Sequence, residues 1–568
     1  MKTLTLLAAV LLAPLTVPLT AQGQAGAPRP AGAVWPDEGP RTWAPRATEG
    51  AITPDDLRTH IYQLADDSMK GRSAGTLENS KAADYIAAHF RRLGLQPAGE
   101  NGTFFQELDY GRVAFDRNAV RLSAAGTALR AGTDWVPIPA SGSLRTRGDF
   151  ALENVPTVFG GTYAETSVAL DPALVRGKVV VFLAPVGPGN DRRAEEGGAV
   201  AFLIVTGAPS PSAGAQAQAF EPDIGMMPAA STLPAAAIVA ASAAQRLFDQ
   251  PLEQLAVGTA GRPVSGSWAP SFEQLEFPAR NIIAVLPGSD PELRGQYVLV
   301  GAHNDHVGMT PEGSLDHDSL RAFNRVMRPQ GANDRPGPPS AAQQRVIDSL
   351  IAVARTVRPV RRDSVMNGAD DDASGTALLL EIAERFTTQP APRRSILFIS
   401  HAAEESGLLG SDYFVGHPTV PLDSIVAAHN MDMVGNGAVT DVRFGGPAQV
   451  QMLGARRLSS EFGDMIDSLN AVRPETMAID YSWDRTNALN RFCRSDQVSY
   501  FRKTIPVTYF STGYSLDYHQ ATDEPQYIDY EKSARVGRFV HEIMASVASR
   551  TPRLAVLPLE QRDMSANC

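Results

Sequence analysis

At 568 residues the chain is too long for one ordinary hydrophobic core, so two or three domains are expected. With 43% hydrophobic and 20% charged residues, the composition is that of a globular protein and not of a disordered chain. The formal net charge of -11 argues against a nucleic-acid partner, because affinity for phosphate backbones rests on clustered Lys and Arg.

The first residues have the order of a secretory signal peptide. Lys2 precedes an apolar stretch from Leu4 to Leu19, and small residues follow it. Pro14 and Pro18 interrupt the stretch, which disfavours a membrane span. We therefore expect residues 1–25 to be a signal peptide and the mature protein to be exported, either periplasmic or secreted, with no membrane span after cleavage.

The sequence contains two cysteines, Cys493 and Cys568. Disulfides therefore cannot be the main source of stability, and the spacing alone leaves open whether these two pair. A zinc site built on thiolates is excluded by the same count. Any metal must be held by His and carboxylate side chains.

Residues 26–50 are rich in Pro, Gly and Ala and are expected to form an extended linker. A helix should follow, because Thr53 can cap it and Pro54 suits its first turn. A second helix should end at Gly94. Apolar residues recur at helical spacing at Leu57, Ile61 and Leu64, and again at Ala82, Tyr85, Ile86, Phe90 and Leu93.

From about residue 145 to 275 the chain is rich in Ala, Gly, Ser and Pro around short apolar runs. Three of these runs predict buried strands, at 179–183, 201–205 and 236–239. The stretch contains no plausible cluster of metal ligands. We expect it to support the structure or to gate substrate access.

From Asn281 onward, strand-like runs alternate with helical patterns, which favours an α/β sheet covered by helices on both faces. Ligand groups in such sheets gather beyond the carboxyl ends of the strands. The strand-like runs are 282–286, 297–301, 396–400, 425–428 and 506–510, and the helical patterns are 373–386 and 531–548.

Three of these apolar runs lead into side chains that can bind metal. The first leads into His303 and Asp305, the second into Glu404 and Glu405, and the third into Asp432. Each piece has an ordinary explanation, since a single His at a strand end is usually structural and a Glu pair is usually surface charge. The occurrence of all of them at strand ends makes the ordinary explanation improbable.

Three adjacent carboxylates, Asp370, Asp371 and Asp372, open the helical pattern at 373–386. Like charges at 4 Å repel by about 4 kcal/mol per pair at an effective dielectric of 20. A helix N-terminus carries too little partial charge to offset three carboxylates. A bridging divalent cation is the simplest explanation for their survival together.

Together these residues resemble peptidase family M28, the zinc aminopeptidases that share a catalytic domain with glutamate carboxypeptidases and glutaminyl cyclases. The matching segments are Gly301-Ala302-His303-Asn304-Asp305-His306, Gly368 to Gly375, Ala403 to Ser411, Asn430 to Met433 and Asp517 to Gln520. The segment Gly71 to Gly75 resembles the family's N-terminal entry.

The resemblance implies a mixed, largely parallel sheet sandwiched by helices, the zinc aminopeptidase-like phosphorylase/hydrolase fold. Residues 51–145 and 276–550 would form the peptidase domain, and 551–568 a C-terminal tail. Residues 146–275 are similar to a protease-associated domain, a smaller β-rich α/β insertion. Its supporting pattern is Val175 to Lys178 before one strand and Gly197 to Ala199 before another.

By the same resemblance, Asp371 would bridge two zinc ions. One ion would also take Glu405 and His519, and the other His303 and Asp432. Three protein ligands per ion leave room for a water molecule or a substrate group.

The resemblance also implies roles for three residues that bind no metal. Glu404 would be the general base, and Asp305 would orient His303. Tyr518 would hydrogen-bond the oxyanion that forms during peptide hydrolysis. The substrate would be a peptide or small protein.

Several nearby residues are set aside. Gly331 to Asp334 imitates the Asp371 motif, but prolines follow where the motif needs a helix. His306, His317, His401 and His429 occupy no ligand position of the family. Residues 308–367, which include a helical pattern at 342–357, are expected to form a lid or pocket wall.

Three alternatives stay open from the sequence. A glutaminyl cyclase would use a single zinc ion, a carboxypeptidase would act on small acidic peptides, and a binding module would have lost its metals. The presence of both His303 and Asp432 favours the two-metal hydrolase. The preferred N-terminal residue, the native metal and the oligomeric state are not fixed by the sequence.

Overall fold

The computed structural model describes residues 30–138, 151–162, 170–184, 198–227, 235–436, 446–484, 489–566 and 568. The expected signal peptide lies outside these residues. The chain forms two compact units. The first contains residues up to Ser73, Lys81–Phe105 and Ile282–Cys568, and the second contains Ala74–Ser80 and Gln106–Asn281.

The first unit is built on a mixed sheet with a parallel centre. Strands β18, β15, β19 and β22 run parallel, while β14 and β20 pair antiparallel at either side of them. The strands in sheet order are β1 (Gln96–Pro97), β14 (Arg280–Leu286), β18 (Ser395–His401), β15 (Tyr297–His303), β19 (Ile425–Met431), β22 (Val507–Ser511), β20 (Gln449–Leu453) and β21 (Ala478–Asp480), with β2 (Phe105–Glu107) beside β14. The expected strands are therefore confirmed.

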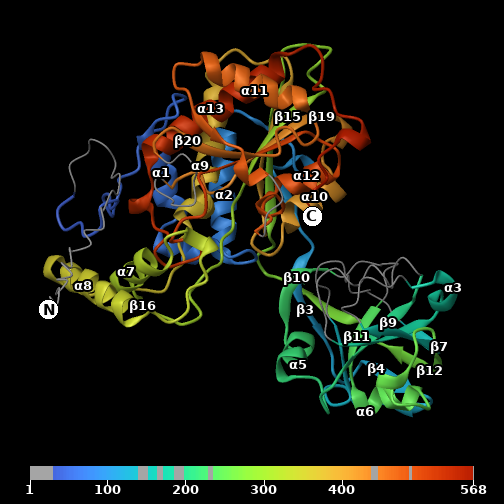
Figure 1. Ribbon diagram of the computed structural model, residues 1–568. Coiled ribbons are helices and arrows are strands. Elements are labelled where there is room, and N and C mark those ends of the chain that lie inside the picture. The colour runs from blue at the N-terminus through green and yellow to red at the C-terminus, as the bar shows by residue number, and fades with distance from the viewer. Residues whose placement is uncertain are drawn as a thin grey trace, which may run out of the picture. The chain divides into compact units, whose positions relative to one another are not determined.

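Helices cover both faces of this sheet (Figure 1). Along β15, Val298 and Val300 pack on one face and Leu299 on the other, as the period of two in a strand requires. One face carries α1 (Pro54–Leu64), α2 (Leu77–Arg92), α9 (Gly375–Thr387) and α13 (Tyr530–Ser549), and the opposite face carries α10 (Leu409–Gly416) and α12 (Gln497–Arg502). The expected fold class is confirmed.

The first helix begins as its sequence predicts. The Thr53 side chain accepts a hydrogen bond from the Asp56 amide, the Asp56 carboxylate accepts one from the Thr53 amide, and Pro54 occupies the first turn. The apolar stripe at Leu57 and Ile61 is fully buried. The helix is therefore fixed at its start by capping and along its length by the core.

Residues 308–367 carry more helix than expected. The expected helix is α8 (Ala341–Val357), which begins with a capping box at Ser340. A second helix, α7 (His317–Met327), was not expected, and a short antiparallel pair joins β16 (Leu315–Asp316) to β17 (Arg362–Asp363). The remaining helix of this unit is α11 (Ser460–Val472).

The segment 30–50, expected to be a linker, is docked on the helices of residues 308–367. Trp35 is 3% exposed, and its Nε1 donates to Asp318 Oδ1 at 3.0 Å. Arg358 contacts both Glu38 and Asp318. Composition alone suggested an extended linker because these buried partners are more than 250 positions away in the sequence.

The second unit holds two sheets. The larger has the order β5 (Thr127–Ala128), β4 (Arg121–Ala124), β12 (Ala260–Ser267), β7 (Ala151–Thr162), β8 (Val179–Leu183), β9 (Ala201–Thr206), β11 (Ala235–Ala240) and β6 (Trp135–Pro137). The smaller contains β10 (Asp223–Met226), β3 (Tyr110–Phe115) and β13 (Pro270–Gln274). Helices α3 (Pro172–Val175), α5 (Ala213–Phe220) and α6 (Ala241–Ala244) lie in the described part of this unit. The three expected strands are β8, β9 and β11.

This unit begins near residue 106, whereas the sequence suggested an insertion over 146–275. The difference arises because β3 and β4 pair with β13 and β12, strands close to residue 270. The composition of a short stretch of sequence does not show which distant strand it pairs with, so the start of this unit could not be predicted from composition.

The two cysteines are joined by a disulfide between Cys493 and Cys568, which fastens the C-terminal tail to the first unit. Among the described residues, no helix has the length and apolar character needed to cross a membrane.

A buried polar pair connects α9 to α1. Glu381 Oε1 lies 2.9 Å from His60 Nε2, and His60 Nδ1 lies 2.8 Å from the Tyr85 hydroxyl. Burial raises the pKa of Glu381 to about 9 and lowers the pKa of His60 well below its usual value. Burial therefore favours the uncharged forms of both groups.

Glu381 should make folding stability fall as pH rises. Between its ordinary pKa of 4.5 and the folded value of about 9, the folded state keeps a proton that the unfolded state releases. Glu381→Gln should remove this slope, whose limit is about 1.4 kcal/mol per pH unit. Denaturant unfolding at pH 8, 8.5 and 9 measures it, a range well above the ordinary histidine pKa of 6.5, so His60 is neutral in both the folded and the unfolded state.

Glu384→Gln is the matched control, because Glu384 lies on the same helix but pairs with Arg92 and has a lowered pKa. Its difference from wild type should stay constant over this range. An equal slope in wild type and Glu381→Gln would contradict the assignment.

Candidate metal centre

The strand ends that the sequence singled out meet at one edge of the sheet. In the parallel ladder, His303 lies opposite His401, and Gly301 lies opposite Asn430. His303 therefore ends β15 beside the turn that carries Glu404 and Glu405 after β18. Asp432 follows directly after β19 at the same edge.

Asp371 lies at the centre of this edge, on a turn of helix (Ala369–Ser374) before α9. One of its oxygens, Oδ1, is 3.2 Å from His303 Nε2, and the other, Oδ2, is 3.1 Å from His519 Nε2. A carboxylate that faces one imidazole with each oxygen has the placement of a bridging ligand.

The side chains form two groups around Asp371. The first contains His303, Asp371 and Asp432, and the second contains His306, Asp371, Glu405 and His519. The ligand atoms within each group all lie within 4.8 Å of one another. All five residues expected as metal ligands are thus brought together, and His306 joins them.

The unsatisfied polar atoms of these residues fit a cation. Among the described residues, His303 Nε2, Asp371 Oδ2, Glu405 Oε1, Asp432 Oδ1 and His519 Nε2 are buried without a hydrogen-bond partner. Buried polar atoms without partners are costly, so a set of them facing one point needs an explanation. Imidazole nitrogens and carboxylate oxygens are metal ligands, and the donor set fits one or two divalent ions.

The other two carboxylates of the aspartate triplet have separate tasks. Asp372 accepts from the amides of His303 at 3.1 Å, Gly375 at 2.8 Å and Met433 at 3.3 Å. Asp370 accepts from the amide of Gly435 at 2.8 Å. These contacts tie the backbones next to His303 and Asp432 to the start of α9, so only Asp371 faces the cluster.

Asp305 fixes the turn after β18. Its two carboxylate oxygens accept from the amides of Glu404 at 3.1 Å and Glu405 at 3.4 Å. Its carboxylate is 3.7 Å from His303 Nδ1, while its carbonyl oxygen is closer, at 3.2 Å. The carboxylate of Asp305 thus makes its hydrogen bonds to the amides of the two glutamates, which the sequence did not suggest, and its backbone carbonyl is the atom nearer to His303.

Charge is concentrated at this edge. Burial raises the pKa of Glu404 well above its usual value, and the neighbouring Asp432 and Glu405 raise it further. Burial alone would raise the pKa of Asp371 too, but the close imidazoles of His303 and His519 hold it well below its usual value. The site therefore contains one strongly proton-attracting carboxylate beside a carboxylate that stays ionised.

Tyr518 lies beside the cluster. Its ring stacks on the ring of His519 with centroids 3.9 Å apart, and its hydroxyl is 3.4 Å from Arg494 Nη2. Burial raises the pKa of Tyr518, so the hydroxyl keeps its proton and can donate a hydrogen bond.

The residues set aside in the sequence lie elsewhere, except His306. Asp334 accepts from the amide of Gln330 and belongs to neither metal-competent group. His317 contacts Glu524, His401 contacts Tyr500, and His429 contacts Thr508. These three histidines have structural partners.

A buried arginine connects two of the loops that carry the cluster. Arg72 is 1% exposed and donates to the carbonyl oxygens of Asn304, Asn367 and Gly368. It thereby joins the loop after β15 to the loop before α9. The sequence had suggested only that Gly71 to Gly75 marks the entry to the domain.

The loop that carries His519 is clamped by residues 308–367. Arg321 on α7 contacts both Asp517 and Asp37, and its guanidinium lies 3.4 Å from the centre of the Tyr527 ring. Asp517 also accepts from Thr522 Oγ1 at 2.6 Å. The stretch expected to be a lid therefore anchors a metal-competent loop.

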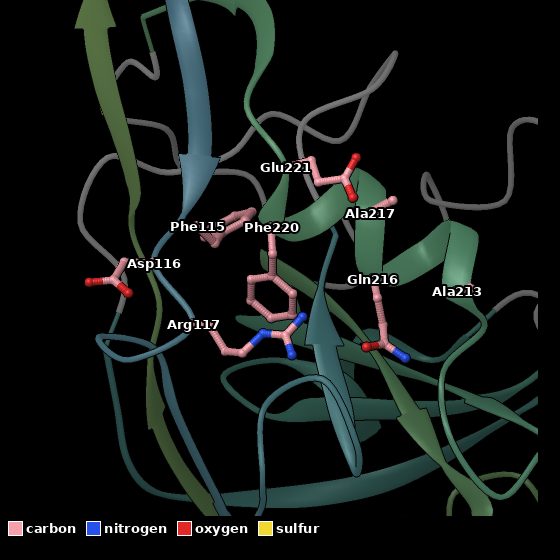
Figure 2. Close-up of a pocket in the computed structure, with 8 residues that line it drawn as sticks. All are labelled: Phe115, Asp116, Arg117, Ala213, Gln216, Ala217, Phe220 and Glu221. Carbon is pink, nitrogen blue, oxygen red and sulfur yellow. The ribbon is translucent and has the colours of Figure 1, made fainter.

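A cavity of about 570 Å³ lies in the second unit, between α5 and the end of β3. Figure 2 shows Phe115, Phe220 and Arg117 around it, with the Arg117 guanidinium 4.6 Å from the centre of the Phe220 ring. None of the expected site residues lines this cavity. The candidate site is therefore the cluster at the sheet edge.

Residues 281–544, which contain every residue of the cluster, match the sequence profile described as Peptidase family M28. This part of the chain is an M28 peptidase domain. The cluster at the strand ends thus lies wholly inside the matched residues.

The chain is similar to a probable zinc metalloprotease of Pyrenophora tritici-repentis, 36% identical over 16% of this chain and 20% of that protein. It is also similar to the aminopeptidase NAALADL1 of Mus musculus, 26% identical over 50% of this chain and 41% of that protein. The chain spans less than half of the length of these curated relatives. Among solved structures, an aminopeptidase from Aneurinibacillus sp. strain AM-1 is 17% identical over 90% of this chain and 97% of that one, with a TM-score of 0.43.

Arg321→Met should weaken metal binding without touching a ligand. It removes the clamp on the His519 loop and leaves Asp517 without its charged partner, and losses of supporting contacts cost about 10- to 100-fold in metal affinity. Competition with a chromophoric chelator measures the affinity, and hydrogen exchange of residues 514–524 measures the loosening.

Arg325→Met is the matched control, because Arg325 lies one turn further along α7 and contacts Asp37 but not Asp517. It should bind metal with nearly wild-type affinity. Equal affinities for wild type and both variants would show that the clamp does not support the site.

Proposed function

We propose that the protein is a metal-dependent aminopeptidase that hydrolyses N-terminal peptide bonds with two zinc ions. The observation that carries the proposal is the placement of Asp371 between two groups of ligand atoms. His303 and Asp432 would complete one metal position, and Glu405 and His519 the other. The names of the relatives, a zinc metalloprotease and an aminopeptidase, support zinc and this reaction.

Bound zinc would polarise the scissile carbonyl and make an attacking water more acidic. Glu404 would act as the general base: its carboxylate takes a proton from the water as the water oxygen bonds to the carbonyl carbon. The same carboxyl then gives that proton to the departing amine as the carbon–nitrogen bond breaks.

Two further residues would assist. The amide of Glu404 donates to Asp305, which holds the turn, and so the base, at the cluster. The Tyr518 hydroxyl would donate to the oxyanion of the tetrahedral intermediate. The substrates would be peptides or small proteins with a free N-terminus.

We also propose that the protein is exported and that residues 146–275 belong to a protease-associated domain. The Cys493–Cys568 disulfide supports export, since such bonds persist in oxidising compartments. The parallel strands β7, β8, β9 and β11 support a small α/β unit in this part of the chain.

Glu404→Gln should keep the bound metal and lose about 10²- to 10⁴-fold in turnover, because the amide cannot accept the proton. Steady-state kinetics and elemental analysis of the same preparation test both statements. Full activity of the variant would reject Glu404 as the base.

Asp371→Asn serves as the contrasting variant. It replaces a charged bridge with a neutral ligand, so metal occupancy itself should fall. If Asp371→Asn retained two equivalents of zinc, the bridging role would be wrong even if Glu404 behaved as expected.

A panel of aminoacyl-anilides and Gln-initiated peptides, with and without a chelator, tests the reaction class. We expect anilide hydrolysis that the chelator abolishes and added zinc restores. Ring closure of the Gln peptides without hydrolysis would instead identify a cyclase. Release of C-terminal residues from blocked acidic peptides would identify a carboxypeptidase.

A further inference from the structure

His306 is held firmly beside the cluster, although its sequence position suggested no ligand role. Its side chain has no exposed surface. Its amide donates to the Arg72 carbonyl at 3.3 Å, and a Cβ on Gly368 would come within 2.5 Å of its ring. The backbone on two sides therefore fixes where this ring lies.

The His306 ring faces the same point as Glu405 and His519. Its Nδ1 is 2.7 Å from Glu405 Oε1 and 3.8 Å from Asp371 Oδ2. His519 Nε2 is 3.1 Å from Asp371 Oδ2 and 3.0 Å from Glu405 Oε2. Ligand atoms around a tetrahedral zinc ion with bonds of about 2 Å lie about 3.3 Å apart, a value within the range of these distances.

Among the described residues, the polar side chains that approach this ring are Glu405 and Asp371, both members of the cluster. Neither ring nitrogen of His306 has a hydrogen-bond partner there, and Glu405 Oε1 has none either, despite the short approach. A fully buried imidazole without a partner is costly. His401 and His429, by contrast, each hydrogen-bond a hydroxyl outside the cluster, that of Tyr500 and that of Thr508.

We propose that His306 Nδ1 is a fourth protein ligand on the side of Glu405 and His519. This inference rests on the proposed metal pair and makes its two positions unequal. The position of Glu405, His519, Asp371 and His306 would be filled by protein, as in tightly held zinc sites. The position of His303, Asp371 and Asp432 would keep an open coordination place for solvent or substrate.

The experiment uses the full mature chain, stripped of metal and reloaded with one or two equivalents of zinc. Wild type should show two separated affinities in competition with a chromophoric chelator. X-ray absorption of the protein with one equivalent should report two imidazole ligands, those of His306 and His519. His306→Ala should weaken the tighter affinity by about tenfold or more and reduce this count to one.

His429→Gln is the matched control, because His429 is also buried but contacts Thr508 rather than the cluster. It should retain both affinities and both imidazole ligands. Thermal unfolding of the metal-free proteins shows whether either variant loses structure before metal is added.

The outcomes separate this inference from the proposed function. If wild type binds two zinc ions and His306→Ala is unchanged, only the role of His306 is overturned. If affinity falls while the imidazole count stays the same, His306 positions Glu405 and is not a ligand. If wild type binds no zinc at all, the proposed function fails as well.

Discussion

Mutual repulsion among buried carboxylates at one sheet edge is the constraint on which the rest of this structure depends. Asp371, Glu404, Glu405 and Asp432 converge there, and all of them except Glu405 are less than 9% exposed. Such a group cannot remain ionised in a low-dielectric interior without compensating charge. Buried imidazoles and amides supply part of the compensating positive charge. The ligand atoms without hydrogen-bond partners indicate that a cation would supply the rest.

The supporting contacts make sense in this light. The carboxylates of Asp372 and Asp305 accept hydrogen bonds from backbone amides next to the candidate ligands. The Asp523 carboxylate accepts from the amides of Asp370 and Asp371. Each contact holds a loop that repulsion would otherwise push outward. The acidic residues of this edge thus divide into those that face the cluster and those that hold the others in place.

Much of this could be predicted from the sequence. The strands, the fold class and the meeting of His303, Glu405 and Asp432 followed from apolar runs that end in ligand residues. Asp371 was suggested by the crowded aspartate triplet, and His519 only by the resemblance to family M28. Strands and helices can be predicted from a single segment, because the spacing of its apolar residues follows the period of a strand or a helix. The three adjacent aspartates were also recognised as unusual, but only Asp371 faces the cluster. The other two carboxylates accept hydrogen bonds from backbone amides, and such contacts cannot be predicted from composition.

The contacts that could not be predicted join distant segments. Arg321 to Asp517, Trp35 to Asp318 and β3 to β13 are pairings for which no single stretch of sequence carries a signal. His306 is a different case, because its spacing after His303 was visible but unremarkable. Only the enclosure of its ring beside Glu405 distinguishes it from an ordinary core histidine.

The order of the ligand residues along the chain has a consequence for biogenesis. His303 comes first and His519 comes near the end, with Asp371, Glu405 and Asp432 between them. The group that contains Glu405 and His519 therefore stays incomplete during synthesis until residue 519 is available, whereas the group of His303, Asp371 and Asp432 has all its members by residue 432. The two groups are thus completed at different stages of synthesis, and the one that contains His519 forms last.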